Sequence, residues 1–226
     1  MKKTIRIWDL PIRLFHWLLV VCITASFITV KVGGNAMQWH AYAGYCALTL
    51  IIFRVCWGFV GSYHARFLNF VPSPLGLIAY LKGNAKSVLG HNPLGSLSVL
   101  GLIFSVSLQA LTGLFANDDI AFEGPFTKYV SDSTVQLLTS IHHTNETVLI
   151  VLICLHLLAI AYYLKFKREN LLKPMLLGDK EIDPSEEAKY LPSDLVRASK
   201  DGALQRGLAF ILLALIAALI IYLINI

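Results

Sequence analysis

The chain has 226 residues, of which 56% are hydrophobic and only 15% are charged. Soluble domains carry about 25% charged residues on average, so this composition excludes an ordinary soluble domain, a disordered chain and a disulfide-rich secreted module. The formal net charge of +5 would suit a protein that binds nucleic acid, but the distribution of the basic residues explains it without such a partner.

Five mostly apolar stretches are each long enough to cross a bilayer, which takes about 20 residues. Lipid admits only helices or closed barrels, and the stretches are too long for strands. The basic start resembles a signal peptide, but no small-residue cleavage site follows, so we expect a retained first span. The sequence therefore predicts an all-α, polytopic membrane bundle in contact with lipid. It forms a single domain over residues 1–226, with spans at about 12–30, 39–60, 96–116, 137–164 and 204–225.

The basic residues lie almost entirely in connections on one side of the predicted bundle. With a cytoplasmic N-terminus, 16 of the 19 Lys and Arg residues lie on the cytoplasmic side, and only Lys31 and Lys128 lie outside. The positive-inside rule therefore predicts a cytoplasmic N-terminus and a periplasmic C-terminus. The outer loop at 117–136 is acidic, because it carries Asp118, Asp119, Glu123 and Asp132. We expect no nucleic-acid partner.

Four histidines lie inside the predicted spans or at their ends. His16 is near the inner end of the first span, and His40 is near the outer end of the second. In the fourth span His142 and His156 are 14 residues apart, so they share a helix face about 21 Å apart along the axis. His143 points about 140° away from His156 by the same geometry, and we expect it not to be a ligand.

The predicted topology allows two histidine pairs. His16 meets His156 on the inner side, and His40 meets His142 on the outer side. A lone histidine in a span is more often a hydrogen-bonded interfacial residue, but two pairs stacked across a bundle suit the axial ligands of two b-type haems.

Two further residues of the second span fit this arrangement. Arg54 lies 14 residues after His40, on the same face, and a buried arginine needs a counter-charge such as a haem propionate. Alternatively, the Arg54 side chain extends to the cytoplasmic surface and keeps its charged end in water. Arg13, near the start of the first span, is a second candidate partner for a propionate.

In the second span, Gly44 leaves room for a flat macrocycle one turn after His40, or for close helix packing. In the third span, Gln109 is expected to make an interhelical hydrogen bond.

Several motifs together resemble one protein family, the bacterial cytochrome b-561 and nickel–iron-hydrogenase b-type cytochrome subunits. The motifs are WDLPIRLFHW (8–17), HAYAGY (40–45), RVCWGFVG (54–61), GHNPLG (90–95), the spacing from His142 to His156, and ENLLKPMLLGDK (169–180). Residues 181–226 match only in carrying a last hydrophobic helix.

The resemblance implies a four-helix haem-bearing bundle with a fifth, C-terminal transmembrane helix. It implies two b-type haems with His16, His40, His142 and His156 as axial ligands. Such proteins pass electrons between the quinone pool of the bacterial inner membrane and a periplasmic partner, either a c-type cytochrome or a hydrogenase. A homo-oligomer is compatible with this reading, and quinone oxidoreductase activity is expected of such a subunit.

His91 and Asn92 precede the third span on the inner side and are candidates for a quinone site. A histidine there can donate a hydrogen bond and carry a proton, whereas Asn92-Pro93 can equally form an ordinary turn.

Two other functions remain open. An autonomous superoxide:quinone oxidoreductase would need a basic outer funnel to attract its anionic substrate. The outer loop is acidic, so we rank this function below electron transfer to a periplasmic partner. A haem-free anchor or transporter would use the histidines to carry protons.

Overall fold

The computed structural model of the chain describes residues 3–84, 88–118, 120, 122–190 and 197–226. Lys2, Lys86 and Asp119, which contribute to the predicted charge pattern, lie outside these ranges. By its internal contacts the chain divides into two compact units. The first unit contains Met1–Leu14, Val55–Leu100 and Leu155–Ala209, and the second contains Phe15–Arg54, Gly101–Cys154 and Phe210–Ile226.

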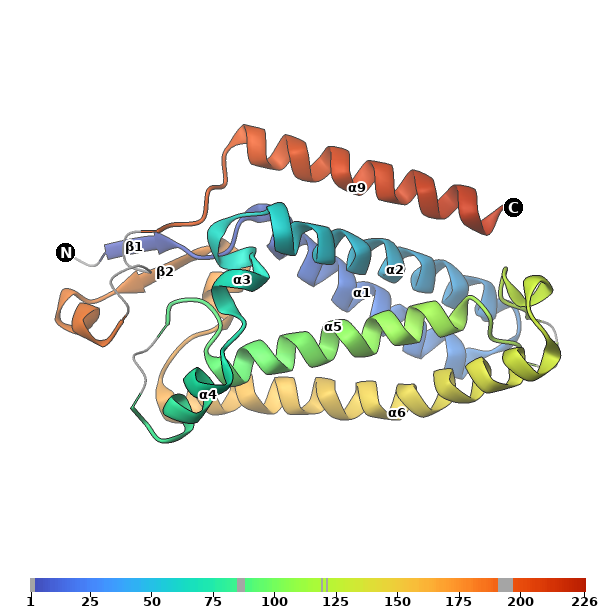
Figure 1. The fold of residues 1–226 in the computed structure, drawn as a ribbon, viewed down its shortest axis with the longest axis horizontal. Helices are drawn as coiled ribbons and strands as arrows, with labels where there is room; N and C mark the ends of the chain where they lie inside the picture. The colour runs from blue at the N-terminus through green and yellow to red at the C-terminus, as the bar shows by residue number, and fades with distance from the viewer. Residues whose placement is uncertain (1–2, 85–87, 119, 121, 191–196) are drawn as a thin grey trace. The chain divides into compact units, whose positions relative to one another are not determined.

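Within the described residues, five helices are long and apolar enough to cross a membrane. The prediction of a polytopic helical membrane bundle is therefore confirmed. These helices (Figure 1) are α1 (Leu10–Val32), α2 (Met37–Val60), α5 (Pro93–Gly113), α6 (Asp132–Tyr162) and α9 (Ala203–Ile224).

The third long helix, α5, begins and ends three residues before the expected span. Pro93 stands at its first position, and Asn92 Oδ1 accepts a hydrogen bond from Gly95 N at 2.8 Å, which together make a strong helix start. Helix α6 starts at Asp132, five residues earlier than expected, and continues into a π-helical turn at Tyr163–Lys167. Arg168 ends that turn in the left-handed conformation, with φ of 53°.

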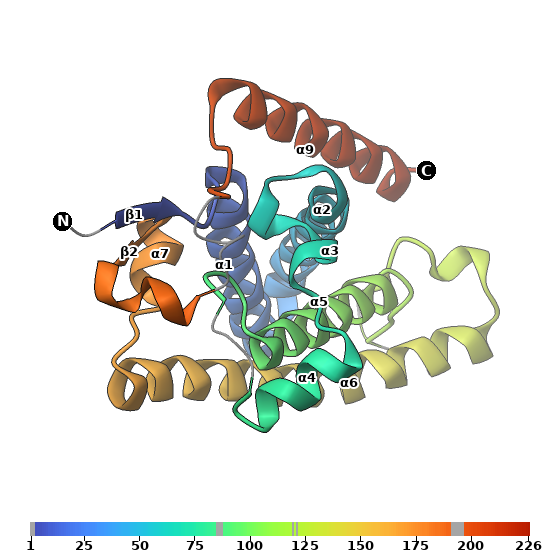
Figure 2. The ribbon, with the colours of Figure 1, turned by 60° about the vertical axis from the view of Figure 1, so that its left-hand side comes forward.

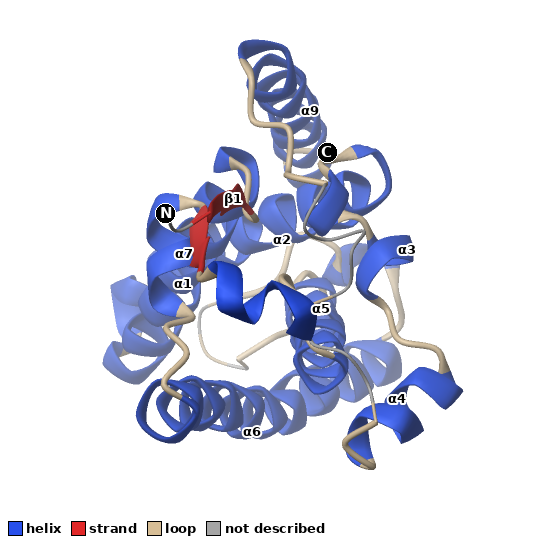
Figure 3. Ribbon diagram, turned by 90° about the vertical axis from the view of Figure 1, so that its left-hand side faces the viewer, coloured by secondary structure: helices blue, strands red, loops and turns tan. Residues whose placement is uncertain are grey.

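A small antiparallel sheet in the first unit was not predicted. Strand β1 (Lys3–Arg6) pairs with β2 (Asp179–Ile182), and strands are red in Figure 3. Lys3 lies opposite Ile182. The short helix α7 (Leu172–Leu177) leads into β2 (Figure 2) through Gly178, which has φ of 92°. A Cβ at Gly178 would lie 2.7 Å from the Trp8 carbonyl oxygen, so this turn requires glycine.

The start of α1 is fixed by two buried carboxylates of the first unit. Asp9 is completely buried, accepts a hydrogen bond from Ile12 N at 2.8 Å and accepts another from Trp57 Nε1 at 3.0 Å. Asp201, which precedes α9, accepts from Leu10 N at 3.1 Å. Asp201 also forms ion pairs with three arginines, Arg6, Arg13 and Arg206.

The connection between α2 and α5 in the first unit carries a 3₁₀ turn at Tyr63–Ala65 and two short helices, α3 (Phe67–Phe70) and α4 (Pro74–Leu81). The Ser73 side chain caps α4 by accepting from Gly76 N at 3.0 Å. Further 3₁₀ turns lie at Gly34–Ala36, Thr127–Tyr129 and Pro184–Lys189.

Candidate functional site

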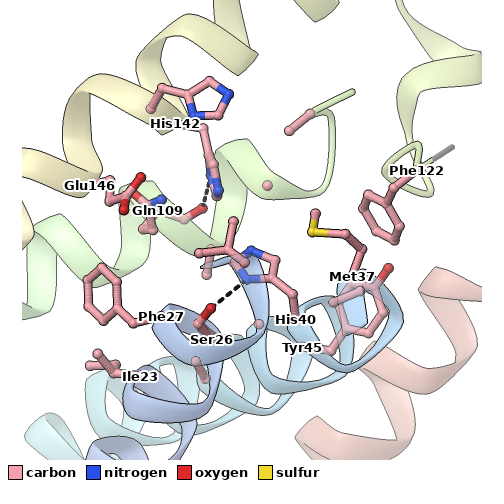
Figure 4. Close-up of a pocket in the computed structure, with 18 of the residues that line it drawn as sticks. Ile23, Ser26, Phe27, Met37, His40, Tyr45, Gln109, Phe122, His142 and Glu146 are labelled. Atoms are coloured by element: carbon pink, nitrogen blue, oxygen red, sulfur yellow. Dashed lines mark hydrogen bonds between the residues drawn. The ribbon is translucent and has the colours of Figure 1, made fainter. Parts of the chain in front are cut away.

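A pocket in the second unit is lined by helices α1, α2, α5 and α6 and by the loop that follows α5. Apolar and small side chains form most of its wall, and His40 and His142 lie within it (Figure 4). His40 comes from α2 and His142 from α6. The predicted outer pair of histidines therefore shares one cavity.

The two imidazole rings lie edge-on to each other, with their centroids 6.3 Å apart and their planes at 80°. A metal–imidazole bond is about 2 Å long, and the ring centroid lies roughly 1 Å beyond the bound nitrogen. Two imidazoles on opposite sides of one iron therefore have centroids about 6 Å apart. The observed separation fits one haem iron between these rings.

Hydrogen bonds fix the orientation of both rings. His40 Nδ1 lies 3.0 Å from the Ser26 carbonyl oxygen, and His142 Nδ1 lies 3.0 Å from the Gln109 carbonyl oxygen (Figure 4). A carbonyl oxygen can only accept, so Nδ1 carries a proton in each ring, and in the neutral form of the ring Nε2 keeps its lone pair. This is the arrangement in which a metal-binding histidine donates its second nitrogen to a carbonyl group.

Two glycines give the site its space. A Cβ on Gly44, which lines the pocket, would meet no atom within 4 Å. A Cβ on Gly113 would lie 3.0 Å from His142 Cε1. The first glycine therefore leaves open volume beside His40, and the second leaves room for the imidazole itself. This space and the two imidazoles fit a haem, which His40 and His142 would hold.

A buried polar cluster joins α5 to α6 next to the pocket. Asn145 Nδ2 donates to Gln109 Oε1 at 2.7 Å and to the Ser105 carbonyl at 2.9 Å, and Ser105 Oγ donates to Asn145 Oδ1 at 3.1 Å. The interhelical hydrogen bond expected of Gln109 is therefore confirmed. Asn145 lies three residues after His142, so the cluster holds together the helix that carries His142 and the helix that carries its carbonyl acceptor.

His143 also borders the pocket, but its side chain is exposed, and its ring lies 6.1 Å from that of His142. Glu146 lines the same side of the pocket and forms a 3.6 Å ion pair with Lys31. The ring that faces His40 is that of His142.

The predicted inner pair is divided between the two units. His16 belongs to the second unit, where its ring packs edge-on against Trp17 at 5.0 Å, and His156 belongs to the first. Their pairing stays a prediction.

The two arginines predicted as propionate partners have different surroundings. Arg54 is buried, with 3% of its surface exposed. Arg13 Nη1 donates to the Leu176 carbonyl at 2.7 Å in the first unit. A propionate role for either arginine also stays a prediction.

The structure gives Asn92 a local structural role. Its Oδ1 caps α5, and its Nδ2 donates to the Tyr163 hydroxyl at 2.7 Å. The ring of His91 lies between those of Trp8, at 4.7 Å, and Phe70, at 4.9 Å. The turn-forming alternative therefore accounts for the contacts of Asn92, and a quinone contact by either residue stays a prediction.

Sequence reasoning missed the contributions of Ser26, Thr112 and Gly113. Ser26 acts through its backbone carbonyl, which no side-chain pattern reveals. Thr112 and Gly113 lie at the end of an apolar helix, and only their distance to His142 shows that they belong to the site.

Comparison with known proteins identifies the family. Residues 7–178 match the family model of the prokaryotic cytochrome b561. The chain is 23% identical over 218 residues to a "Probable Ni/Fe-hydrogenase B-type cytochrome subunit" of Rhizobium leguminosarum bv. viciae, covering 79% of this chain and 90% of that protein. It is 25% identical over 216 residues to a protein of the same name from Azotobacter chroococcum mcd 1, covering 78% and 88%. The chain therefore belongs to the prokaryotic cytochrome b561 family and is a multi-pass membrane b-type cytochrome of electron transfer.

Proposed function

We propose that the chain is a di-haem cytochrome of the bacterial inner membrane that carries electrons between the quinone pool and a periplasmic redox partner. The proposal rests on the neighbouring rings of His40 and His142, whose centroids are 6.3 Å apart and whose Nδ1 atoms both contact carbonyl oxygens. His16 and His156 would hold the second haem.

The chain's own residues supply the setting for electron transfer. When bound, haem supplies one-electron iron chemistry. The two carbonyl contacts keep each Nε2 available as a ligand, and the apolar wall of the pocket excludes water. Because ligation, burial and hydrogen bonding set the potential of a haem, these features are what the protein contributes to the reaction.

A hydrogenase is the partner that the similar proteins favour, because their names describe subunits of Ni/Fe-hydrogenases. A periplasmic c-type cytochrome is the alternative partner. The superoxide:quinone activity ranks below both, because the side chains Asp118 and Glu146 line the pocket and would repel an anionic substrate.

The ligand assignment is tested by a pair of neighbouring variants. Visible and electron paramagnetic resonance spectra are recorded for purified wild type, His142→Ala and His143→Ala. We expect His142→Ala to lose one low-spin haem and His143→Ala to keep the wild-type spectrum. Loss of a haem in His143→Ala with retention in His142→Ala would overturn the assignment. A wild-type protein without a Soret band after expression with ample haem would support the haem-free anchor or transporter.

The reaction itself is tested by mixing the oxidised protein with a short-chain quinol in proteoliposomes and following haem reduction. We expect rapid reduction in wild type and a slower rate in His91→Ala with both haems retained, since His91 is the candidate proton carrier. An Asn92→Ser variant keeps a capping oxygen but removes the amide of the second candidate, so a slower rate in that variant would assign a quinone contact to Asn92 as well. Equal rates in wild type and His91→Ala would place the quinone elsewhere, and no reduction of wild type would contradict a quinol-linked function.

A further inference from the structure

Two threonines make the same local contacts beside the two site histidines. Thr29 Oγ1 on α1 lies 2.7 Å from the Ala25 carbonyl and 3.2 Å from the Ser26 carbonyl. Thr112 Oγ1 on α5 lies 2.6 Å from the Leu108 carbonyl and 3.2 Å from the Gln109 carbonyl. In each case the carbonyl three residues before the threonine is the one that accepts from a site histidine.

The two threonines differ in their contact with the imidazole. Thr112 Oγ1 also lies 3.2 Å from His142 Nδ1, and the Thr112 side chain is buried. Among the described residues, Thr29 makes no such contact with His40. The local backbone environment is therefore matched at the two positions, and only one hydroxyl reaches its histidine.

The protons available decide the direction of these contacts. A threonine hydroxyl has one proton, and the Leu108 carbonyl, at 2.6 Å, is its shortest acceptor. The oxygen of Thr112 therefore turns a lone pair toward His142, whose Nδ1 carries a proton. His142 Nδ1–H therefore donates to two acceptors, the Gln109 carbonyl and the Thr112 hydroxyl. His40 Nδ1–H donates to the Ser26 carbonyl.

We propose that Thr112 is a positioning residue for His142: its hydroxyl, oriented by the Leu108 carbonyl, is a second acceptor that holds the imidazole and lowers the reduction potential of the haem bound to it. This rests on the proposed function, because it assigns His142 as an axial ligand. Acceptors on Nδ1–H make the imidazole a stronger donor to the metal. A stronger donor stabilises ferric over ferrous iron, so loss of the acceptor shifts the potential upward.

The test compares Thr112→Val, Thr112→Ser and Thr29→Val in the full-length, haem-loaded protein by redox titration monitored optically. Valine keeps the shape of threonine without its hydroxyl, and serine keeps the hydroxyl. A neutral hydrogen bond makes a small contribution to stability, and only the part of it that differs between the two oxidation states of the haem changes the potential. At a fixed ambient potential, we expect the ferrous-to-ferric ratio of one haem in Thr112→Val to rise about threefold. This corresponds to an upward shift of the reduction potential of about 28 mV, because a tenfold change in ratio corresponds to about 59 mV for one electron. Thr112→Ser and Thr29→Val should match wild type.

Haem content and low-spin spectra are measured on the same samples, so that a changed potential is not confused with a lost ligand. If Thr112→Val loses its haem, Thr112→Ala is judged by the same criterion. Equal potentials in wild type and a haem-retaining Thr112→Val or Thr112→Ala would overturn the inference, as would an equal upward shift in Thr29→Val. Absence of any His142-dependent haem in wild type would instead overturn the proposed function beneath it.

Discussion

Single residues decide how much room the pocket offers, and its two glycines do so in different ways. The open space beside Gly44 belongs to the pocket, whereas the space beside Gly113 is already taken by the His142 ring, 3.0 Å from the position of a Cβ. A methyl group at the first position would compete with a bound macrocycle. A methyl group at the second would displace a side chain of the protein itself.

Gly44→Ala is expected to weaken haem retention without destabilising the haem-free chain, because the added Cβ meets no protein atom within 4 Å. Gly207→Ala is the matched control, since Gly207 is also a helical glycine with no atom within 4 Å and lies outside the pocket lining. Haem transfer from each variant to an excess of apomyoglobin measures retention. Equal transfer rates in the two variants would show that the haem does not lie against Gly44.

Gly113→Ala is expected to move the His142 ring and to cost about 1–3 kcal/mol, as overpacking of a filled site does. The signature is a changed low-spin spectrum at one haem together with easier thermal loss of that haem. A variant indistinguishable from wild type in both measurements would contradict the position of the ring.

Helices α5 and α6 are joined by a cluster of buried polar side chains within otherwise apolar packing. Asn145 is 6% exposed and joins α6 to α5 through Ser105 and Gln109. Interhelical hydrogen bonds in membrane proteins contribute roughly 0.6–2 kcal/mol each. The cluster therefore stabilises the helix pair that carries His142 and the Gln109 carbonyl.

Replacing Asn145 by Leu is expected to lower the free energy of unfolding by about 1–2 kcal/mol, because Gln109 and Ser105 lose their buried partner. Unfolding in mixed micelles with increasing dodecyl sulfate measures the change. A double-mutant cycle with Gln109→Leu should return a positive coupling energy, and strict additivity of the two changes would argue against the cluster.

The junction before α9 depends on Asp201, which Arg6, Arg13 and Arg206 surround. Burial alone would raise the pKa of Asp201, but hydrogen bonds from Arg206, Leu10 N and Arg6 together lower it below its usual 3.8. The pKa of Asp179 is lowered as well, mainly by its hydrogen bonds from Arg6.

Because the folded-state pKa values of these carboxylates are lowered, their stabilisation is fully present above about pH 4 and is lost as the pH falls through the folded-state values. Asp201→Asn should therefore reduce stability at neutral pH and flatten the loss of stability below pH 4. Thermal unfolding between pH 7 and pH 3 tests this. An equally steep acid loss in wild type and Asp201→Asn would assign the acid sensitivity to other groups.

For the whole molecule, the features that follow from composition and spacing were predictable from the sequence. Apolar length alone predicts the five long helices, and the places of His40 and His142 in the second and fourth spans predict that they meet. The β1–β2 pair was not predictable, because two four-residue strands more than 170 positions apart carry no periodic pattern. The Ser26 and Gln109 acceptors were not predictable either, because every helical residue has a carbonyl group and only the structure shows which two receive an imidazole.

Counting the haems per chain is the sharpest test of two haems held by four histidines. Purified protein is assayed by pyridine haemochrome against protein concentration from amino-acid analysis, for wild type, His142→Ala and His156→Ala. We expect close to two haems per chain in wild type and close to one in each variant, because each variant loses one axial ligand from a different pair. A wild-type value of one, or a variant that keeps both haems, would contradict it.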